Sequence, residues 1–237
     1  MPTATAAQVA NQVSASAGNA PGHQRGPVAC AAAVGFRRVR ATAARGALRF
    51  SIARARRAPF SVSVFEAAHG RRVVDNRRVF HARSLRGSFG WRPSARLPDG
   101  AYFARVGMSL PGGRHDIRRV TLRLSHGRFH VVASHYRRDT CGTISSFKLS
   151  SPAFGGTTRA ALGVAYRLGV DADAVRVELL RGTRVVRHLA QAGHQRARTT
   201  YRLRIAPAGL ARGTYRVRLT VHAGRRVVRS LLTSRRL

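Results

Sequence analysis

The stretch DGAYFARV, at Asp99–Val106, recurs in altered form as RGTYRVRL at Arg212–Leu219, 113 residues further along the chain. Both copies open with a glycine-containing corner and a tyrosine. In the second copy the apolar residues Tyr215, Val217 and Leu219 then alternate with arginine. Alternation with a period of two places one face of a strand in a core and the other in water, as in antiparallel sheets. The stretch therefore predicts a strand that follows a tight corner, in a fold that is built twice.

Two further matches occur at nearly the same spacing. The turn GRRVV at Gly70–Val74 recurs as GTRVV at Gly182–Val186, and the pair Cys30 and Phe36 recurs as Cys141 and Phe147. The offsets are 112 and 111 residues, and loop insertions produce a drift of this size. Three matches in the same order indicate an internal duplication.

Period-two alternation extends through both copies and is interrupted by Gly, Pro and Asp turn signals. The strands predicted for the first copy are 36–41, 47–54, 59–66, 71–80, 86–91, 101–109 and 116–124, with 128–132 appended. Those of the second copy are 145–149, 160–168, 174–180, 183–189, 199–205, 214–221 and 225–233. About seven strands in roughly 100 residues is typical of an Ig-like sandwich. We therefore predict an all-β chain of two tandem Ig-like or fibronectin-III-like antiparallel β-sandwiches, at 30–135 and 141–237, after a flexible low-complexity segment at 1–29.

The first copy resembles the Ig-like domain of the flagellar hook-capping protein. The residues that carry the resemblance run from Val62 through the turn at Gly70–Val74, then Phe89–Trp91, then Leu97–Tyr102. The second copy departs from this pattern, with Tyr201 near the position of Trp91 and Arg212 in place of Asp99. The resemblance implies an Ig-like fold with a structural or assembly role and no catalytic residues. The same module occurs as a repeat in extracellular proteins, particularly those of actinobacteria, and a fold by itself does not define a function.

The charge of the chain is strongly unbalanced. Its 44 basic residues stand against 8 acidic ones, for a formal net charge of +36, and Lys148 is the sole lysine. Such a field attracts nucleic acid, anionic polysaccharide or anionic lipid without a designed site. The near-absence of lysine favours a compositional bias, because attraction to phosphate alone would accept either residue. The Arg pairs are spread over strands and turns, which is weak support for a specific nucleic-acid site.

The first 30 residues are rich in Ala, Thr, Ser, Gly and Gln and contain Pro2, Pro21 and Pro27. This composition is typical of a flexible linker and lacks the basic and apolar regions of a signal peptide. No stretch approaches the roughly 18 apolar residues that span a bilayer, so no transmembrane segment is expected. A chain that begins within a linker is expected to be the C-terminal part of a longer protein, unless its start is misassigned.

Signals of catalysis are weak. The neighbouring carboxylates Asp171 and Asp173, and likewise Asp99, are best explained as turn formers. No G-x-S-x-G motif occurs, and no spacing of Ser, His and Asp points to a triad. We therefore predict no enzyme, no catalytic or cofactor-binding residues and no cofactor.

One histidine cluster has residue types that could in principle bind zinc, since zinc takes imidazole and thiolate. It comprises His126, His130 and His135, with Cys141 downstream. Its spacing fits no standard pairing, and we interpret these histidines as surface residues and predict no metal.

The two cysteines, Cys30 and Cys141, lie at equivalent points of the two copies. A bridge between them would tie the ends of the first domain together and stabilise it by about 4–5 kcal/mol in the chain-entropy model. Equivalent positions in tandem domains need not lie close, so free thiols are the alternative. A bridge would fit an oxidising, extracellular setting.

The aromatic residues are expected to be structural. Tyr102 and Tyr215 occupy the tyrosine-corner position of Ig-type sandwiches, and Trp91 is expected in the core. Only Phe65 and Phe103 depart from the apolar phase of their strands, which is too few for a single-strand nucleic-acid platform.

The resulting hypothesis is a non-enzymatic Ig-like repeat module of a secreted or cell-surface protein. It would serve as a structural spacer or as an adhesive domain for anionic cell-envelope polymers, bound through the Arg-rich outer strand faces. A nonspecific nucleic-acid-binding protein is the alternative, and a hydrolase with an unfamiliar site is the second.

Overall fold

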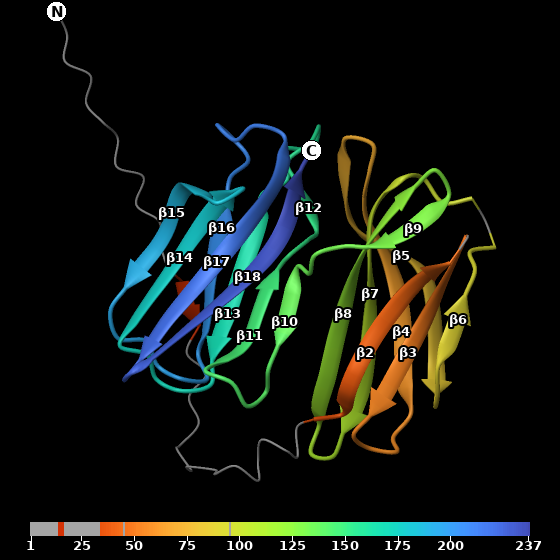
Figure 1. Cartoon of the computed structure of the whole chain (residues 1–237), viewed down its shortest axis with the longest axis horizontal. Coiled ribbons are helices and arrows are strands. Elements are labelled where there is room, and N and C mark those ends of the chain that lie inside the picture. The colour runs from red at the N-terminus through yellow and green to blue at the C-terminus, as the bar shows by residue number, and fades with distance from the viewer. Residues whose placement is uncertain (1–13, 17–33, 45, 95) are drawn as a thin grey trace, which may run out of the picture.

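The computed structural model describes residues 14–16, 34–44, 46–94 and 96–237, and this part of the chain is all β (Figure 1). Every strand predicted from the sequence is present. The strands of the first sandwich are β2 (Phe36–Ala44), β3 (Ala47–Arg54), β4 (Phe60–His69), β5 (Arg72–Leu85), β6 (Phe89–Trp91), β7 (Gly100–Leu110), β8 (Arg114–Ser125) and β9 (Arg128–Val131).

The second sandwich contains three short strands that the alternation did not predict. Its strands are β10 (Tyr136–Arg138), β11 (Ile144–Leu149), β12 (Ala153–Phe154), β13 (Leu162–Leu168), β14 (Ala174–Arg181), β15 (Arg184–Ala192), β16 (Thr200–Ile205), β17 (Gly213–Ala223) and β18 (Arg226–Arg236), and β1 (Ser14–Ser16) pairs with β16. The unpredicted strands β1, β10 and β12 have only two or three residues each, too few to show a period.

Strand order shows that the two sandwiches have the same topology. The small sheet runs β2-β3-β6 in the first, and its counterpart in the second contains β11-β13-β16. The large sheet runs β5-β4-β7-β8 in the first and β15-β14-β17-β18 in the second. This is the antiparallel two-sheet arrangement of Ig-like and fibronectin-III-like domains. The fold class expected from the sequence is confirmed.

The edge beside the last long strand of each large sheet is filled differently. In the first sandwich β9 lies antiparallel to β8, whereas in the second β12 lies parallel to β18. An added edge strand covers backbone groups that would otherwise be open to pairing with another chain.

Each sandwich has its own core, which the alternating residues fill. In β7, Tyr102, Ala104, Val106 and Met108 are buried, and in β17 Tyr215, Val217, Leu219 and Val221 are buried. The buried residues fall into two separate hydrophobic clusters, one for each sandwich. Each sandwich is therefore packed around an interior of its own, as a domain is.

Hydrogen bonds join the two sandwiches at two places. Near the link between the domains, Arg118 Nη1 on β8 donates to Arg138 O on β10 at 3.1 Å. At the other end, Thr157 N donates to Arg71 O, in the turn between β4 and β5, at 2.9 Å. Figure 1 shows this β4–β5 hairpin reaching up beside the end of the chain near β12.

The chain crosses from one domain to the other within residues 132–143, between β9 and β11. The strand β10 lies inside this region and pairs with β11, so the second sandwich includes residues before 141. Most of the predicted flexible segment 1–29 lies outside the described residues, and within it β1 is a strand. No helix in the described residues is long and apolar enough to cross a membrane.

Candidate functional site

The two repeated tyrosines close the corners that precede their strands. The Tyr102 hydroxyl donates to Pro98 O at 2.7 Å, and the Tyr215 hydroxyl donates to Ala211 O at 2.8 Å. Each bond spans four residues back along the chain, which is the geometry of a tyrosine corner. Burial raises the pKa of the Tyr102 phenol well above its usual value, and the nearby Glu66 raises it further. A phenol held protonated in this way acts as a hydrogen-bond donor to the corner.

Trp91 lies in the first core, where it is 7% exposed. Its ring contacts Phe80 at 5.1 Å and Phe129 at 5.7 Å between centroids. Aromatic rings at these distances contribute packing energy beyond the area they bury. The position of Trp91 is that of a core residue.

The histidines considered as zinc ligands lie in different environments. His126 is exposed in a turn with positive φ, and His130 is exposed on β9. His135, by contrast, is fully buried, so its interpretation as a surface residue is wrong. Its Nδ1 lies 2.8 Å from the Thr121 hydroxyl, and its ring packs against Phe103, because the chain folds back over β8 as it leaves the first sandwich. In the described residues no group of three or more His, Cys, Asp or Glu could hold a metal ion.

Cys141 lies in the exposed turn between β10 and β11, where its N–H donates to Asp139 Oδ1 at 3.3 Å. Cys30 lies outside the described residues. The Cys30–Cys141 bridge therefore stays a prediction. Counting thiols on the unfolded, unreduced protein tests it: the bridge predicts none, and two would contradict it.

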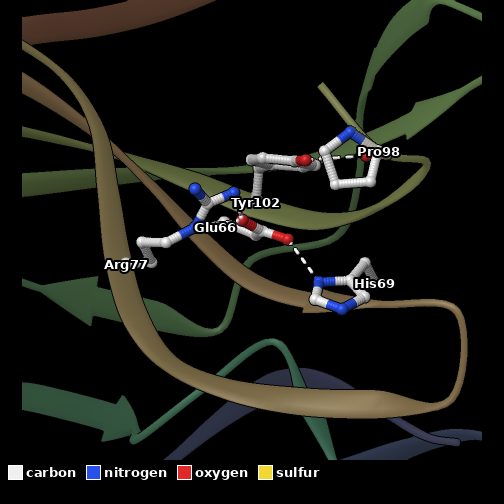
Figure 2. Close-up of polar contacts among 5 residues, drawn as sticks. All are labelled: Glu66, His69, Arg77, Pro98 and Tyr102. Carbon is white, nitrogen blue, oxygen red and sulfur yellow. Dashed lines mark hydrogen bonds and ion pairs between the residues drawn. The ribbon is translucent and has the colours of Figure 1, made fainter. Parts of the chain in front are cut away.

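The carboxylates are committed to structural contacts. Glu66, fully buried beside Tyr102, accepts from His69 Nδ1 at 2.6 Å and from Arg77 Nε at 2.8 Å, as Figure 2 shows. Asp116 is also fully buried and accepts from the backbone N–H groups of Gly35 and Phe36, which fixes the start of β2 to β8.

The predicted turn-forming carboxylates cap backbone N–H groups in loops. Asp171 accepts from Ala197 N at 2.6 Å, Asp173 from Gly224 N at 2.7 Å, and Asp99 from His126 N at 2.8 Å. Asp171 and Asp173 thus serve two different loops, and neither contact resembles the paired carboxylates of a glycosidase.

Phe65 and Phe103 lie outside the apolar alternation of their strands, as the sequence predicts. Their rings stack on the outer face of the large sheet, with 5.1 Å between the ring centroids. Phe65 is half-buried, but Phe103 is only 3% exposed. The burial of Phe103 has a clear cause, since the Arg119 guanidinium lies over its ring at 5.0 Å and His135 packs at its edge. The sequence of β7 alone does not predict how exposed Phe103 is, because the groups that cover its ring come from β8 and from the link between the domains.

The outer face of β4, β5, β7 and β8 carries a hollow of about 420 Å³. Its polar lining includes Ser63, Arg78, His81, Arg83 and Arg105. Within it Arg83 Nε donates to His81 Nε2 at 2.7 Å, and His81 Nδ1 lies 2.8 Å from the Ser63 hydroxyl. Burial lowers the pKa of His81, and Arg83 and Arg78 lower it further. The lining contains no carboxylate, so the hollow favours anions.

A second basic hollow lies where the two sandwiches meet. It is lined by Arg114 of the first sandwich and by Arg138, Lys148, Arg167 and Arg198, which follow the first sandwich in the chain. Partial burial lowers the pKa of the Lys148 amine, and Arg119, Arg202 and Arg105 lower it further, in that order. The basic residues spread along the sequence thus converge at one place in space. The spacing of these basic residues along the sequence does not predict that they line one hollow, because their strands belong to different domains.

No known protein family and no curated protein sequence matches the chain. The chain is similar in structure to a segment of two fibronectin type-III domains from chicken tenascin, with 11% identity and a TM-score of 0.28 over 84% of this chain and 99% of that one. It is also similar to Dpr2 Ig1-Ig2 in its complex with DIP-Theta Ig1-Ig3, with 11% identity and a TM-score of 0.24 over 81% of this chain and 59% of that one.

A third similar structure is an α-L-rhamnosidase from Dictyoglumus thermophilum, with 7% identity and a TM-score of 0.27. The likeness covers 86% of this chain but only 29% of that one. The shared strand order and the two separate cores define the fold of this chain. By those criteria the chain is a tandem pair of Ig-like β-sandwiches.

Proposed function

We propose that this chain is a non-enzymatic Ig-like module of a secreted or cell-surface protein, which adheres to anionic cell-envelope polymers. The observation that supports this most is the excess of cations without carboxylate partners on the outer sheet faces. The ion pairs among the described residues engage only three carboxylates, Glu66, Asp116 and Glu178. With 44 basic residues in the chain, most of the positive charge is available to an external anion.

A role as spacer is compatible with adhesion. The sandwiches are joined by the bond from Thr157 N to Arg71 O and by the bond from Arg118 to Arg138 O, so the pair would present its outer faces in a fixed relation. The resemblance of the first copy to the hook-capping Ig-like domain supports a structural or assembly role for the module. Ig-like domains are common in extracellular proteins, and the predicted Cys30–Cys141 bridge would fit that setting.

The main alternative is nonspecific binding of nucleic acid, which uses the same field. Sequence-tolerant binding of single strands relies on exposed aromatic rings beside basic groups. Here Phe103 is covered and Trp91 is in the core, which favours a polymer that needs no stacking. A hydrolase would need an available acid or nucleophile, and the buried carboxylates are already engaged.

Binding at physiological salt distinguishes these functions. The purified chain would be titrated with polygalacturonate, with two duplex DNAs of equal length and different sequence, and with a panel of chromogenic glycoside and ester substrates. We expect binding to polygalacturonate, equal affinity for the two DNAs, and no turnover. Strong preference for one DNA sequence, or turnover that survives repurification, would overturn the proposal.

A further inference from the structure

Four cationic side chains from the two sandwiches meet at the junction between the domains. Arg105 on β7 and Arg119 on β8 come from the first sandwich, and Lys148 on β11 and Arg202 on β16 come from the second. Arg105 and Arg119 are directly opposite each other on β7 and β8. The Arg119 guanidinium lies over the ring of Tyr136, which is the register partner of Lys148. Lys148 and Arg202 are in turn both register partners of Ala165, on either side of β13. We refer to these four residues as the junction cluster.

The strongest charges that act on Lys148 all have its own sign. The positive charge of Arg119 is only weakly compensated. Its Nη1 lies 3.4 Å from His135 Nε2. Its buried Nε has no hydrogen-bond partner among the described residues. Burial lowers the pKa of the Arg119 guanidinium, an effect that Tyr136 opposes and Arg105 reinforces. Because burial holds His135 neutral, with a pKa of about 3, it accepts a hydrogen bond without adding charge.

Arg119 is held in place by aromatic rings. Its guanidinium carbon lies 5.0 Å from the Phe103 ring centre and 5.3 Å from the Tyr136 ring centre, one ring in the first sandwich and the other in β10. Cation–π contacts of this kind stabilise and orient a guanidinium. The cluster is therefore arranged before any ligand arrives, and little ordering cost remains to be met on binding.

The junction cluster lies between the two hollows. Arg105 lines the hollow on the first sandwich, and Lys148 lines the one at the domain boundary. Neither lining contains an Asp or Glu among the described residues. Both hollows are open, so a linear molecule could lie in one, cross the cluster and continue into the other.

We propose that the junction cluster is an anion-binding site that takes the carboxylates of a uronic-acid polysaccharide laid across both sandwiches. This proposal rests on the proposed function and assigns its strongest contacts to one place. Guanidinium groups match planar carboxylates with two parallel hydrogen bonds. Four like charges held together destabilise the unliganded chain, and a bound anion relieves that repulsion. The covered aromatic rings leave no platform for bases, which favours a polysaccharide over a single-stranded nucleic acid.

Paired variants of equal charge test the site. Arg105→Gln with Lys148→Gln removes two exposed members of the cluster and spares the packed Arg119. Arg184→Gln with Arg229→Gln removes two exposed arginines from the large sheet of the second sandwich, at positions outside both hollows. The affinity for polygalacturonate should fall about tenfold in the first variant and less than about threefold in the control.

The outcomes separate the two proposals. If the two variants lose affinity equally, the junction site is overturned while adhesion through the whole surface stands. If the unaltered protein does not bind polygalacturonate, both are overturned. If single-stranded DNA of equal charge binds more tightly than polygalacturonate and depends more on the cluster, the assignment to a polysaccharide is overturned.

Lys148 provides a second measurement, because it is the sole lysine. Reductive methylation with ¹³C-formaldehyde labels this amine and the N-terminal amine only. On addition of polygalacturonate the Lys148 methyl resonance should shift, and its titration should move to higher pH, since a nearby carboxylate stabilises the charged amine. A Lys148 resonance that does not change while the polymer is bound would overturn the site.

Discussion

His135 shows how a single side chain marks the passage from one domain to the next. It is a polar residue at a position without secondary structure, in a region whose alternation has ended, and these features predict exposure. Its burial is produced by tertiary contacts: Thr121 bonds to its ring and its backbone, and Phe103 packs against it. Those partners lie 14 or more residues away, so the sequence around His135 contains no trace of them.

Burial of His135 predicts a pH dependence of stability. The unfolded chain protonates this imidazole near pH 6.5, but the folded chain does so only near pH 3. Because the unfolded state binds the extra proton between these values, the free energy of unfolding should fall as the pH drops through this window. Urea unfolding at pH 7 and pH 5, for the unaltered protein and for His135→Gln, measures it. The unaltered protein should lose about 2 kcal/mol more than the variant. Equal losses would contradict the burial of a neutral His135.

The tyrosine corners predict a pair of equal effects. Tyr102→Phe and Tyr215→Phe each remove a hydroxyl that donates to a backbone carbonyl four residues earlier. Each should lower the free energy of unfolding by about 1–2 kcal/mol, since the ring still fills its place in the core. Chemical denaturation of the two variants checks this. Unchanged stability in either would show that its corner is held by other contacts.

At the scale of elements, the β4–β5 turn and the loop after β12 form the contact farthest from the link between the domains. Thr157 N donates to Arg71 O, and a Cβ on Gly156 would lie 2.1 Å from that same oxygen. Gly156 also has a φ of +64°, where a side chain is strained. The Gly-Arg turn that identified the repeat thus has a tertiary role in the first copy.

Two glycine substitutions separate the strain from the contact. Gly182 lies in the β14–β15 turn, which is the counterpart of the β4–β5 turn. Its φ of +60° is similar to that of Gly156, but a Cβ added to Gly182 would have no atom within 4 Å. Gly182→Ala should therefore cost only the left-handed strain, about 1 kcal/mol. Gly156→Ala should cost more and should also abolish the slow hydrogen exchange of the Thr157 amide, measured by NMR. Retention of that protection in Gly156→Ala would show that the two elements are not in contact.

Elements differ in how well the sequence predicted them. The long strands carry several apolar residues in alternation, and all of them were predicted within a few residues of their ends. The strands β10 and β12 were missed because two or three residues cannot show a period, and their pairing depends on neighbours from distant parts of the chain.

At the scale of the whole molecule, the sequence predicted the architecture but not the candidate site. The duplication and the alternation placed most arginines on the outer faces of the strands, as the structure has them. The junction cluster could not be predicted, because Arg105 and Arg119 lie on strands of the first sandwich and Lys148 and Arg202 on strands of the second. Docking depends on main-chain contacts such as that between Thr157 and Arg71, which leave no pattern in the sequence.

The central functional claim is that excess surface cations bind an anionic polymer. The most direct test is the affinity of the unaltered protein for polygalacturonate over a series of salt concentrations. The account predicts a straight line with a steeply negative slope when the logarithm of the association constant is plotted against that of the salt concentration, as cations displace condensed counterions. An affinity that does not change with salt, or no binding even at low salt, would contradict the claim.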